Sequence, residues 1–322
     1  MTKKSFTVIK NCSCLSADIN RSLQKTKKGE KMLNNHEKAD TLVEALPFIR
    51  KYYGKTVVIK YGGSAMADEE IREEFIKDVV LMKYVGINPV IIHGGGPEIN
   101  LMLKKLGKET EFVEGNRVSD TETVEVAEMI LSAKLNKGIV ADINKHGGKA
   151  VGLSGKDGNL ILAKKKYIEK DNQKLDIGFV GEVVKINPEI IEILAEKDYI
   201  PVISSIGQDL EGNTYNINAD YVAGEIAGVL NAFRLLFLTD VDGILTDHND
   251  KATLIPEISS SEVIKLINDG IITGGMLPKV NTCLNAVNKG VKNVIILNGK
   301  VKHSILLELF TYEGFGTMIK SD

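Results

Sequence analysis

Short apolar runs alternate with amphipathic stretches along most of the chain. Runs rich in β-branched residues are typical of buried strands and occur at 57–61, 89–93, 149–153, 200–204, 234–238 and 293–297. Apolar positions at helical spacing predict helices at 69–85, 97–106, 121–145, 188–197, 219–231, 260–269, 276–289 and 303–310. This alternation predicts an α/β fold, in which an open, mainly parallel sheet is covered by helices on both faces.

The region 160–186 departs from the alternation. Its segments "NLILAKKKYI" and "GFVGEVVKIN" read as two strands of a hairpin inserted near the middle of the chain. No internal repeat or low-complexity linker interrupts the rest.

The first part of the chain has a different composition. Residues 1–31 are rich in Lys and Ser, and the longest apolar run, Phe6–Ile9 broken by Thr7, is too short for a signal-peptide core. We expect residues 1–37 to be a disordered extension. A transit peptide is an alternative, since acidic residues are scarce before Gly29. A third hypothesis places the true start at Met32, because Gly29-Glu30 can be encoded by a ribosome-binding sequence.

A kinked helix is predicted over residues 38–54. Thr41-Leu-Val-Glu44 matches a capping box, and Leu42, Leu46 and Ile49 fall on one helical face. Pro47 lies inside this stretch and predicts the kink. The helix precedes a domain over 55–322, and it either covers the core of that domain or packs against another subunit.

Composition excludes several classes of protein. The 322 residues are 43% hydrophobic and 26% charged, as in an ordinary globular protein. A net charge of −2 gives no reason to expect nucleic acid as a partner, and no apolar run approaches the ~20 residues that span a membrane. Three cysteines, Cys12, Cys14 and Cys283, fit neither a disulfide framework nor a zinc site. We therefore expect free thiols and a cytoplasmic protein.

Two glycine-rich turns follow predicted strands. The first is Lys60-Tyr-Gly62-Gly63, and the second is Gly94–Gly96 ahead of Pro97. Ligands of open α/β sheets bind beyond the carboxyl ends of the strands, where bare backbone N–H groups and a helix N-terminus suit an anion. The alternative is a pair of tight turns that need positive φ.

Familiar nucleotide motifs are absent from the sequence. It has no P-loop pattern, no G-x-G-x-x-G followed by a well-placed acidic residue, and none of the protein-kinase signatures. An anion bound at the glycine turns therefore requires a different kind of site.

Three further segments carry polar residues at the ends of elements. "NTYNINADYVAGEIAG" places Asn216, Asn218 and Asp220 at a helix start, where Asn218 is an expected N-cap and Asp220 complements the dipole or serves the site. "ITGGMLPKVNTCLNA" places Gly275 and Lys279 at another helix start. A lysine there is unfavourable for the macrodipole, which indicates an anionic partner.

The third segment, "LFLTDVDGIL", ends a buried strand with Thr239, Asp240 and Asp242. It is either an Asp-Gly turn or a loop on the nucleotide side of a site.

The ordered set of motifs resembles the amino acid kinase superfamily. "VVIKYGGSAM", "VIIHGGGPEI", "GNRVSD", "YNINAD", "LTDVDGIL" and "GGMLPKV" occur in the order seen there, and they are most similar to the N-acetyl-L-glutamate kinases of arginine biosynthesis. The resemblance covers about residues 38–320. It implies a three-layer α/β/α sandwich with an N-terminal acceptor lobe, about 55–205, and a C-terminal nucleotide lobe, about 206–322.

The resemblance implies a reaction in which a carboxylate takes the γ-phosphoryl group of ATP, with Mg²⁺ bridging the phosphates and no dedicated protein site for the metal. Lys60 and Lys279 would stabilise the transferring group, and Asp220 would hold both ammonium groups. Nucleotide binding would fall to Gly62, Gly63, Thr239, Asp240, Asp242 and Gly275.

Acceptor binding is implied for the N-terminal lobe. Arg117 of "GNRVSD" resembles the arginine that grips the substrate's α-carboxylate, with Gly95, Gly96 and Asn216 around the rest of N-acetyl-L-glutamate. The alternative for Arg117 is a surface ion pair with Asp120.

Regulation is implied as well. Arginine-inhibited members of the family form hexamers, as trimers of dimers, through a kinked N-terminal helix that resembles residues 39–53. The inhibitor site would include Glu308, Gly314 and Gly316. The alternative makes Glu308 a solvated helix residue. A signalling protein of the PII type is a further expected partner.

Two competing functions stay open at this level. One is an aminoadipate-type carboxylate kinase of the same superfamily, which acts on a carrier-linked substrate. The other is a nucleotide-binding regulator without turnover, against which the presence of Lys60, Asp220 and Lys279 argues.

Overall fold

The computed structural model describes residues 34–62, 66, 68–170, 173–247 and 250–322. Within this part, residues 34–46 belong to one compact unit and the residues from Pro47 onward to another. The predictions for Cys12, Cys14, Gly63 and the hypotheses about the first 31 residues lie outside the described part. The predicted lobe boundary at 205/206 stays a prediction.

The N-terminal helix begins earlier than predicted. Helix α2 (Asn35–Glu44) is capped by Asn34, whose side chain accepts from His36 N and Glu37 N, while the Glu37 carboxylate accepts from Asn34 N at 2.6 Å. This is a capping box. The box predicted at Thr41 is therefore wrong, because Thr41 lies inside the helix and its hydroxyl donates to Glu37 O.

The predicted kinked helix is two helices. Helix α3 (Leu46–Tyr52) begins after Ala45, which keeps helical dihedral angles (φ −72°, ψ −18°), so the interruption lies before Pro47 and not at it. As the second residue of α3, Pro47 lacks only a backbone donor that the first turn leaves without an intrahelical partner.

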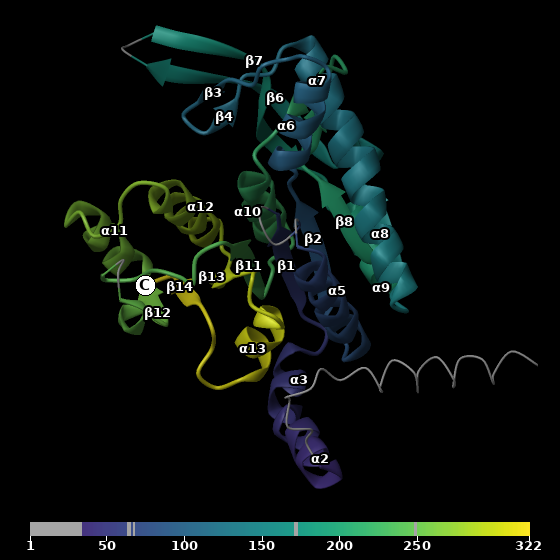
Figure 1. Ribbon diagram of the computed structural model, residues 1–322, viewed down its shortest axis with the longest axis vertical. Helices are drawn as coiled ribbons and strands as arrows, with labels where there is room; N and C mark the ends of the chain where they lie inside the picture. Colours follow the sequence, from purple (N-terminus) through teal and green to yellow (C-terminus); the bar gives the residue numbers. More distant parts are fainter. Residues whose placement is uncertain (1–33, 63–65, 67, 171–172, 248–249) are drawn as a thin grey trace, which may run out of the picture. The chain divides into compact units, whose positions relative to one another are not determined.

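All six predicted strands are present in an eight-stranded sheet (Figure 1). They are β1 (Thr56–Tyr61), β2 (Asn88–His93), β5 (Ala150–Leu153), β8 (Ile200–Ser204), β11 (Arg234–Thr239) and β13 (Asn293–Asn298). The order is β12-β14-β13-β11-β1-β2-β8-β5, and only β14 (Thr317–Lys320) runs antiparallel to its neighbour β13. Like β14, β12 (Glu257–Ser259) is too short for its pattern to be seen in the sequence.

The predicted helices are also present. They are α5 (Glu69–Tyr84), α6 (Gly96–Lys105), α7 (Thr121–Glu128), α8 (Asn136–Lys145), α9 (Glu189–Glu196), α10 (Ala219–Val229), α11 (Ser260–Asn268), α12 (Met276–Asn288) and α13 (Ser304–Phe310). A π-helical stretch, η1 (Met129–Leu135), joins α7 to α8, and short 3₁₀ turns occur at η2 (Asp157–Asn159) and η3 (Lys251–Thr253). None of the described helices is both long and apolar enough to cross a membrane.

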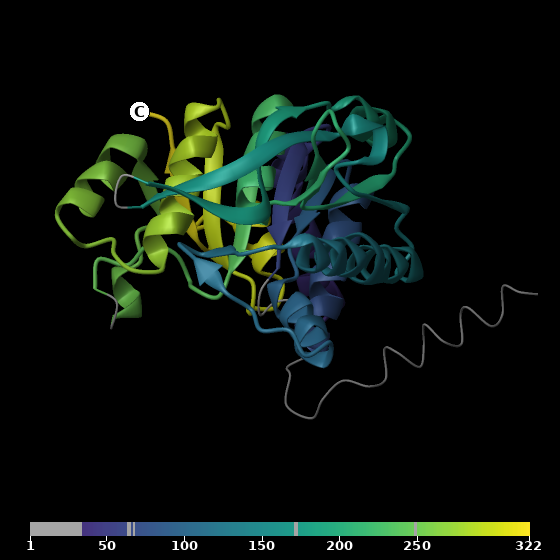
Figure 2. The ribbon, with the colours of Figure 1, turned by 90° about the horizontal axis from the view of Figure 1, so that it is seen from above.

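Two hydrophobic layers cover the sheet, and β1 shows why. Val57, Ile59 and Tyr61 are buried against α5, α8 and α13, whereas Val58 is buried with residues of α10 and α12. Figure 2 views the strands from above, between these helices. Because side chains alternate along a strand, Lys60 points to the same face as Val58, toward α10. The three-layer prediction is confirmed.

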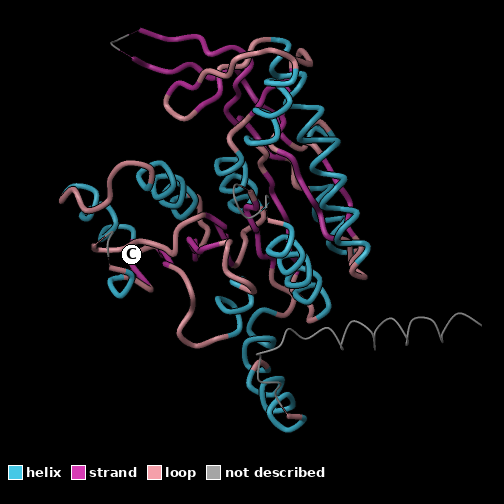
Figure 3. The backbone as a smooth tube through the Cα atoms, viewed as in Figure 1, coloured by secondary structure: helices cyan, strands magenta, loops and turns pink. Residues whose placement is uncertain are grey.

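The inserted hairpin is longer than predicted. Strands β6 (Ile161–Lys170) and β7 (Gln173–Ile186) pair antiparallel, and Figure 3 shows them in magenta. Two short strands, β9 (Ile206–Gln208) and β10 (Thr214–Asn216), close β6 and β7 into a small barrel in the order β10-β7-β6-β9. A smaller hairpin, β3 (Phe112–Val113) with β4 (Asn116–Arg117), carries Arg117.

Candidate active site

Three adjacent parallel strands, β2, β1 and β11, bring the first group of predicted site residues together. Lys60 lies on β1, between Phe237 of β11 and Ile92 of β2 in the register of the sheet. The turn Gly94–Gly96 follows β2, and Thr239 ends β11. The carboxyl ends of these strands therefore meet at one edge, where ligands of such sheets bind.

Lys60 is paired with Asp220. Its Nζ lies 2.9 Å from Asp220 Oδ1, and both side chains are largely buried. The two atoms are at ion-pairing distance without the alignment of a hydrogen bond. Asp220 is held at the start of α10, where Asn218 caps the helix and accepts from Asp220 N at 2.8 Å, as predicted.

Gly62 lies beside this ion pair. A methyl group added at Gly62 would come within 3.6 Å of both Lys60 Nζ and Gly94 N. The two glycine turns and the ammonium group therefore share one small space, which a side chain at Gly62 would begin to fill.

Lys279 has a different carboxylate. Its Nζ lies 2.9 Å from Asp240 Oδ1, and this hydrogen bond lowers the pKa of Asp240. Each lysine therefore has its own partner in this structure, and a role of Asp220 in holding both ammonium groups stays a prediction. Asp240 is the anionic group that offsets a lysine near the start of α12.

The remaining residues of the nucleotide set lie around the β11 turn. Thr239 Oγ1 accepts from Val241 N, and Asp242 accepts from Asn298 at 2.7 Å and from Lys251 at 2.8 Å. The hydrogen bond from Asn298 is the first cause of the lowered pKa of Asp242. Gly275 caps α12, and a methyl group added there would meet no atom within 4 Å, so this helix start is open.

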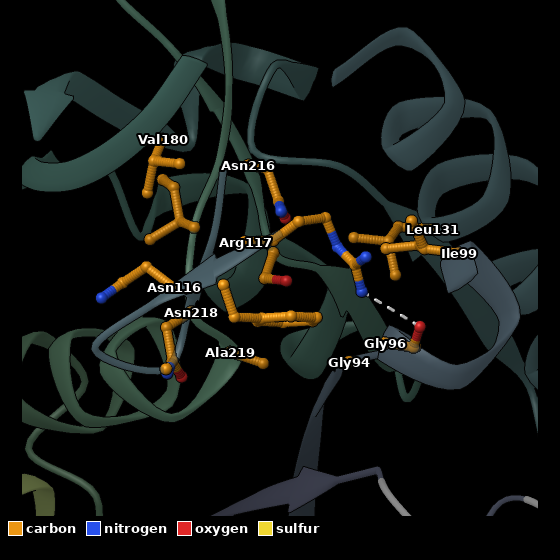
Figure 4. A pocket seen from close by; sticks show the side chains of 15 residues that line it. Gly94, Gly96, Ile99, Asn116, Arg117, Leu131, Val180, Asn216, Asn218 and Ala219 are labelled. Atoms are coloured by element: carbon orange, nitrogen blue, oxygen red, sulfur yellow. Dashed lines mark hydrogen bonds between the residues drawn. The ribbon is translucent and has the colours of Figure 1, made fainter. Parts of the chain in front are cut away.

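A cavity of about 210 Å³ adjoins the glycine turn (Figure 4). It lies between the N-termini of α6 and α10, since Gly95 caps the first helix and Asn218 caps the second. All four residues of the predicted acceptor set line it, namely Gly95, Gly96, Arg117 and Asn216. The turn is formed as expected, although α6 begins at Gly96 and Pro97 is its second residue.

Arg117 is buried in the wall of this cavity. It is 6% exposed, donates to Asn100 Oδ1 at 2.5 Å and to Gly96 O at 3.2 Å, and stacks 4.7 Å from the ring of Phe112. Burial lowers its pKa. Asp120 instead caps α7 and binds Lys108, so the alternative of an Arg117–Asp120 ion pair is wrong. Among the described residues, no carboxylate pairs with the guanidinium.

Sequence reasoning missed some of the lining. Asn100 and Phe112 fix the guanidinium, and Ser205 faces the same cavity. Phe112 lies five residues before Arg117 and reaches it only because β3 and β4 form a hairpin. The signal that could have revealed this hairpin is Gly115, which with Glu114 forms a two-residue turn of positive φ between the strands.

The predicted arginine-site residues lie apart from this cavity. Glu308 is 7% exposed, so the alternative of a solvated residue is wrong. Its carboxylate accepts from Phe315 N at 2.8 Å and from Gly316 N at 3.2 Å, and it pairs with Arg234 at 3.4 Å. Gly314 has φ +66° and lies beside the same carboxylate. The structure therefore brings Gly314 and Gly316 together at the carboxylate of Glu308, which already pairs with the chain's own Arg234.

The fold is shared with solved structures. N-acetylglutamate synthase from Neisseria gonorrhoeae matches with a TM-score of 0.77 at 24% identity, over 88% of this chain and 63% of that one. Carbamate kinase from Giardia matches with a TM-score of 0.61 at 18% identity, over 84% of this chain and 99% of that one. At these identities the likeness concerns the fold alone.

Sequence relatives are much closer. Acetylglutamate kinases of Methanococcus aeolicus and Methanocaldococcus jannaschii are 55% and 54% identical, over 90% and 91% of this chain and the whole of each relative. That of Pelotomaculum thermopropionicum is 55% identical over 88% of this chain and 98% of its own length. Residues 55–298 match the model of the amino acid kinase family. The chain therefore belongs to the amino acid kinase family and, within it, to the acetylglutamate kinases.

Proposed function

We propose that this chain transfers the γ-phosphoryl group of ATP to the side-chain carboxylate of N-acetyl-L-glutamate, forming N-acetyl-L-glutamyl 5-phosphate and ADP. One observation carries the proposal. Arg117 is a buried cation without a carboxylate partner among the described residues, and it faces a cavity beside the Lys60–Asp220 pair. A buried charge requires a counter-charge, and an anionic acceptor supplies one. The names of the relatives support the same reaction.

The acceptor is held at both ends in this proposal. The guanidinium of Arg117, fixed by Asn100 and Gly96, receives the α-carboxylate in a bidentate contact. Asn216 lies on the cavity wall and is suited to hydrogen-bond the acetamido group. The side-chain carboxylate then extends to the glycine turn between the helix N-termini, where the local field favours negative charge.

The transfer needs no general base, because a carboxylate is already ionised at neutral pH. One of its oxygens attacks the γ-phosphorus while the bond to the β–γ bridging oxygen breaks, and ADP leaves with the electron pair. Lys60 and Lys279 neutralise the charge on the transferring group, and the N–H groups of Gly62 and Gly95 donate to its oxygens. Catalysis then rests on alignment and charge stabilisation.

ATP would be held at the β11 turn and the open start of α12, by Thr239, Asp240 and Gly275. The described residues contain no group of three or more His, Cys, Asp or Glu side chains able to hold a metal by themselves. This fits Mg²⁺, which is commonly bound through substrate phosphates and one or two carboxylates. When bound, the ion would neutralise phosphate charge. Asp240 is the carboxylate of the proposed ATP site that would help to hold it.

A hydroxamate assay tests the function directly. The purified chain is incubated with ATP, Mg²⁺ and hydroxylamine, with N-acetylglutamate, glutamate, aspartate or 2-aminoadipate as acceptor. We expect product with N-acetylglutamate and little with the free amino acids, whose ammonium group would lie in a cavity that already holds Arg117. Preference for 2-aminoadipate would favour the superfamily rival, and absence of turnover with every acceptor would refute the proposed function in favour of a kinase of a carrier-linked acceptor or a nucleotide-binding regulator.

We further propose inhibition by L-arginine, as a separate property. Its support is the environment of Glu308, a buried carboxylate beside Gly314 that accepts two backbone N–H bonds and already pairs with one guanidinium. A free arginine would compete with Arg234 for this carboxylate, or bind beside it.

A further inference from the structure

A buried polar chain runs from the interior of the sheet to the glycine turn. His93, the last residue of β2, is fully buried and has one ring nitrogen, Nδ1, 3.0 Å from Gly94 O. Its other nitrogen, Nε2, lies 3.2 Å from Asn136 Nδ2. Asn136, also fully buried, contacts Val202 O on β8 at 2.9 Å and Leu153 O on β5 at 3.3 Å. Three neighbouring strands are thus linked to one carbonyl of the turn.

The hydrogen-bond partners fix the orientation of the Asn136 amide and the tautomer of His93. Carbonyl oxygens only accept, so the Asn136 atom that faces Val202 O is the amide nitrogen, and its oxygen accepts from Lys137 Nζ. The amide nitrogen has two protons for three acceptors, Val202 O, Leu153 O and His93 Nε2, so the tautomer of His93 is fixed from the other side of the ring. Gly94 O also accepts, so Nδ1 carries the proton. Burial lowers the pKa of His93 to about 4, and the ring is neutral at physiological pH.

The turn needs such an anchor. The peptide between Gly94 and Gly95 is flanked by two glycines, which allow it to rotate at little conformational cost. In a trans peptide the C=O and the following N–H point to opposite sides. Holding Gly94 O against the buried ring therefore turns the N–H of Gly95 away from the interior, to the side of the cavity that Gly95 lines.

We propose that His93 is a positioning residue, which orients the Gly94–Gly95 peptide so that the Gly95 N–H donates to the transferring phosphoryl group. Asn136 presents its amide nitrogen to the unprotonated Nε2 and so favours this tautomer. This inference rests on the proposed function, since it assigns a role in the same phosphoryl transfer. It also explains why a histidine occupies the last, fully buried position of β2, where an apolar residue would pack without a polar partner.

Two substitutions separate the bond of His93 to Gly94 O from its contact with Asn136. In His93→Asn the side-chain amide lies where Nδ1 was, so it retains the bond to Gly94 O and loses the contact with Asn136. In His93→Gln the amide reaches the Nε2 position, so it retains the contact with Asn136 and loses the bond to Gly94 O. We expect kcat to fall about tenfold or more in the Gln variant, with KM for both substrates little changed. The loss should stay below the about 10²–10³-fold that follows removal of an oxyanion donor, because the Gly95 N–H is displaced and not removed. The Asn variant should keep kcat within about threefold of wild type, because the peptide stays anchored.

The controls make the outcome decisive. His146→Gln, at the end of α8, should leave kcat unchanged, and thermal unfolding of each variant shows whether it is folded. Equal kcat values in folded Asn and Gln variants would overturn the proposal, as would a wild-type kcat in the Gln variant. ¹⁵N NMR of labelled histidine should show His93 protonated at Nδ1, and protonation at Nε2 alone would contradict it. Wild-type protein that fails to phosphorylate N-acetylglutamate refutes the function, while the NMR result still tests the anchor.

Discussion

The two lysines are the residues on which the proposed chemistry most depends. Removing either ammonium group takes away charge that matters chiefly when the phosphoryl group is in transfer. We therefore expect Lys60→Ala and Lys279→Ala each to lower kcat by about 10²–10³-fold, with a much smaller change in KM for ATP. Steady-state kinetics measure both. Lys164→Ala, an exposed lysine of the β6–β7 hairpin paired with Glu182, is the matched control and should behave as wild type. Near-wild-type kcat in either site variant would remove that lysine from the mechanism.

Arg117 tests acceptor binding separately from chemistry. Its guanidinium donates hydrogen bonds to Asn100 Oδ1 and Gly96 O, and it lines the cavity with donors left for a ligand. Lysine keeps the charge but has no planar fork. Arg117→Lys should therefore raise KM for N-acetylglutamate about tenfold or more, which corresponds to about 1.4 kcal/mol, and leave KM for ATP nearly unchanged. If both constants rose together, the residue would serve the fold rather than the acceptor.

At this scale the sequence revealed residue types better than pairings. Lys60, Asp220 and Lys279 stand out in their motifs, yet the pairing of Lys279 with Asp240 joins residues 39 apart in the chain. Such a pair depends on how α12 packs beside the β11 turn. Likewise Asp120, which was considered as a partner of Arg117, pairs with Lys108 instead.

The glycine turn of α6 depends on packing between elements. A methyl group at Gly95 would collide with Leu135 Cδ1 and lie 2.8 Å from Leu131 Cδ2, both on the π-helical stretch. Gly95→Ala should therefore displace the turn, lowering both kcat and the unfolding temperature. Leu135→Ala, combined with it, removes the closest atom and should restore part of both losses. A single variant as stable and active as wild type would show that the turn has room to spare.

The contact of α5 with α13 predicts a pH dependence of stability. Asp78 is buried, and burial raises its pKa to about 6, while its 2.6 Å contact with His303 Nδ1 acts in the opposite sense. The other ring nitrogen of His303 lies 3.1 Å from Glu74, and His303 itself has φ +57° just before α13.

Because the folded pKa of Asp78 is higher than the ordinary 3.8, the folded state binds its proton more tightly. Its contribution to the unfolding free energy is present in full below about pH 4 and is lost as pH rises through about 6, a change of up to about 3 kcal/mol. Asp78→Asn does not titrate. The unfolding temperature of wild type relative to this variant should therefore fall between about pH 4 and pH 7. A difference independent of pH would contradict the assignment.

Elements with enough residues to show a period were predictable, and the others were not. The six central strands and the long helices follow from apolar runs and helical spacing. Strands of two to four residues, such as β3, β4, β12 and β14, carry too few positions to reveal a pattern. The π-helical stretch between α7 and α8 was read as continuous helix, because one extra residue per turn barely alters the spacing over seven residues.

At the scale of the molecule, the alternation of strands and helices was sufficient to predict the layers, but not the strand order. Because β11 lies next to β1, with Phe237 opposite Lys60, the turn after Thr239 comes to the same edge of the sheet as Lys60. That order comes from packing between segments far apart in the chain. The closure of β6, β7, β9 and β10 into a small barrel has the same origin.

Arginine inhibition and hexamer assembly form the prediction that concerns the whole molecule. Glu308 accepts backbone N–H groups of Phe315 and Gly316 with one carboxylate oxygen, while the other lies 3.4 Å from Arg234. Arg234 is also stacked 5.5 Å from Tyr52 of α3, and its Nε has no hydrogen-bond partner among the residues that the structure describes. The carboxylate thus already holds one buried guanidinium, and a second would alter the packing of α3 on the C-terminal segment.

Millimolar L-arginine should accordingly slow the forward reaction, whereas citrulline, which has the same length and no charge, should not. Sedimentation should show a hexamer, since we expect the N-terminal helices to link the dimers. Binding of a PII-type protein stays a prediction, which sedimentation with that partner added can test. An unchanged rate with arginine, or a species no larger than a dimer, would refute the regulatory proposal and leave the phosphoryl transfer untouched, because Arg117 and Lys60 share no contact with Glu308 in the described residues.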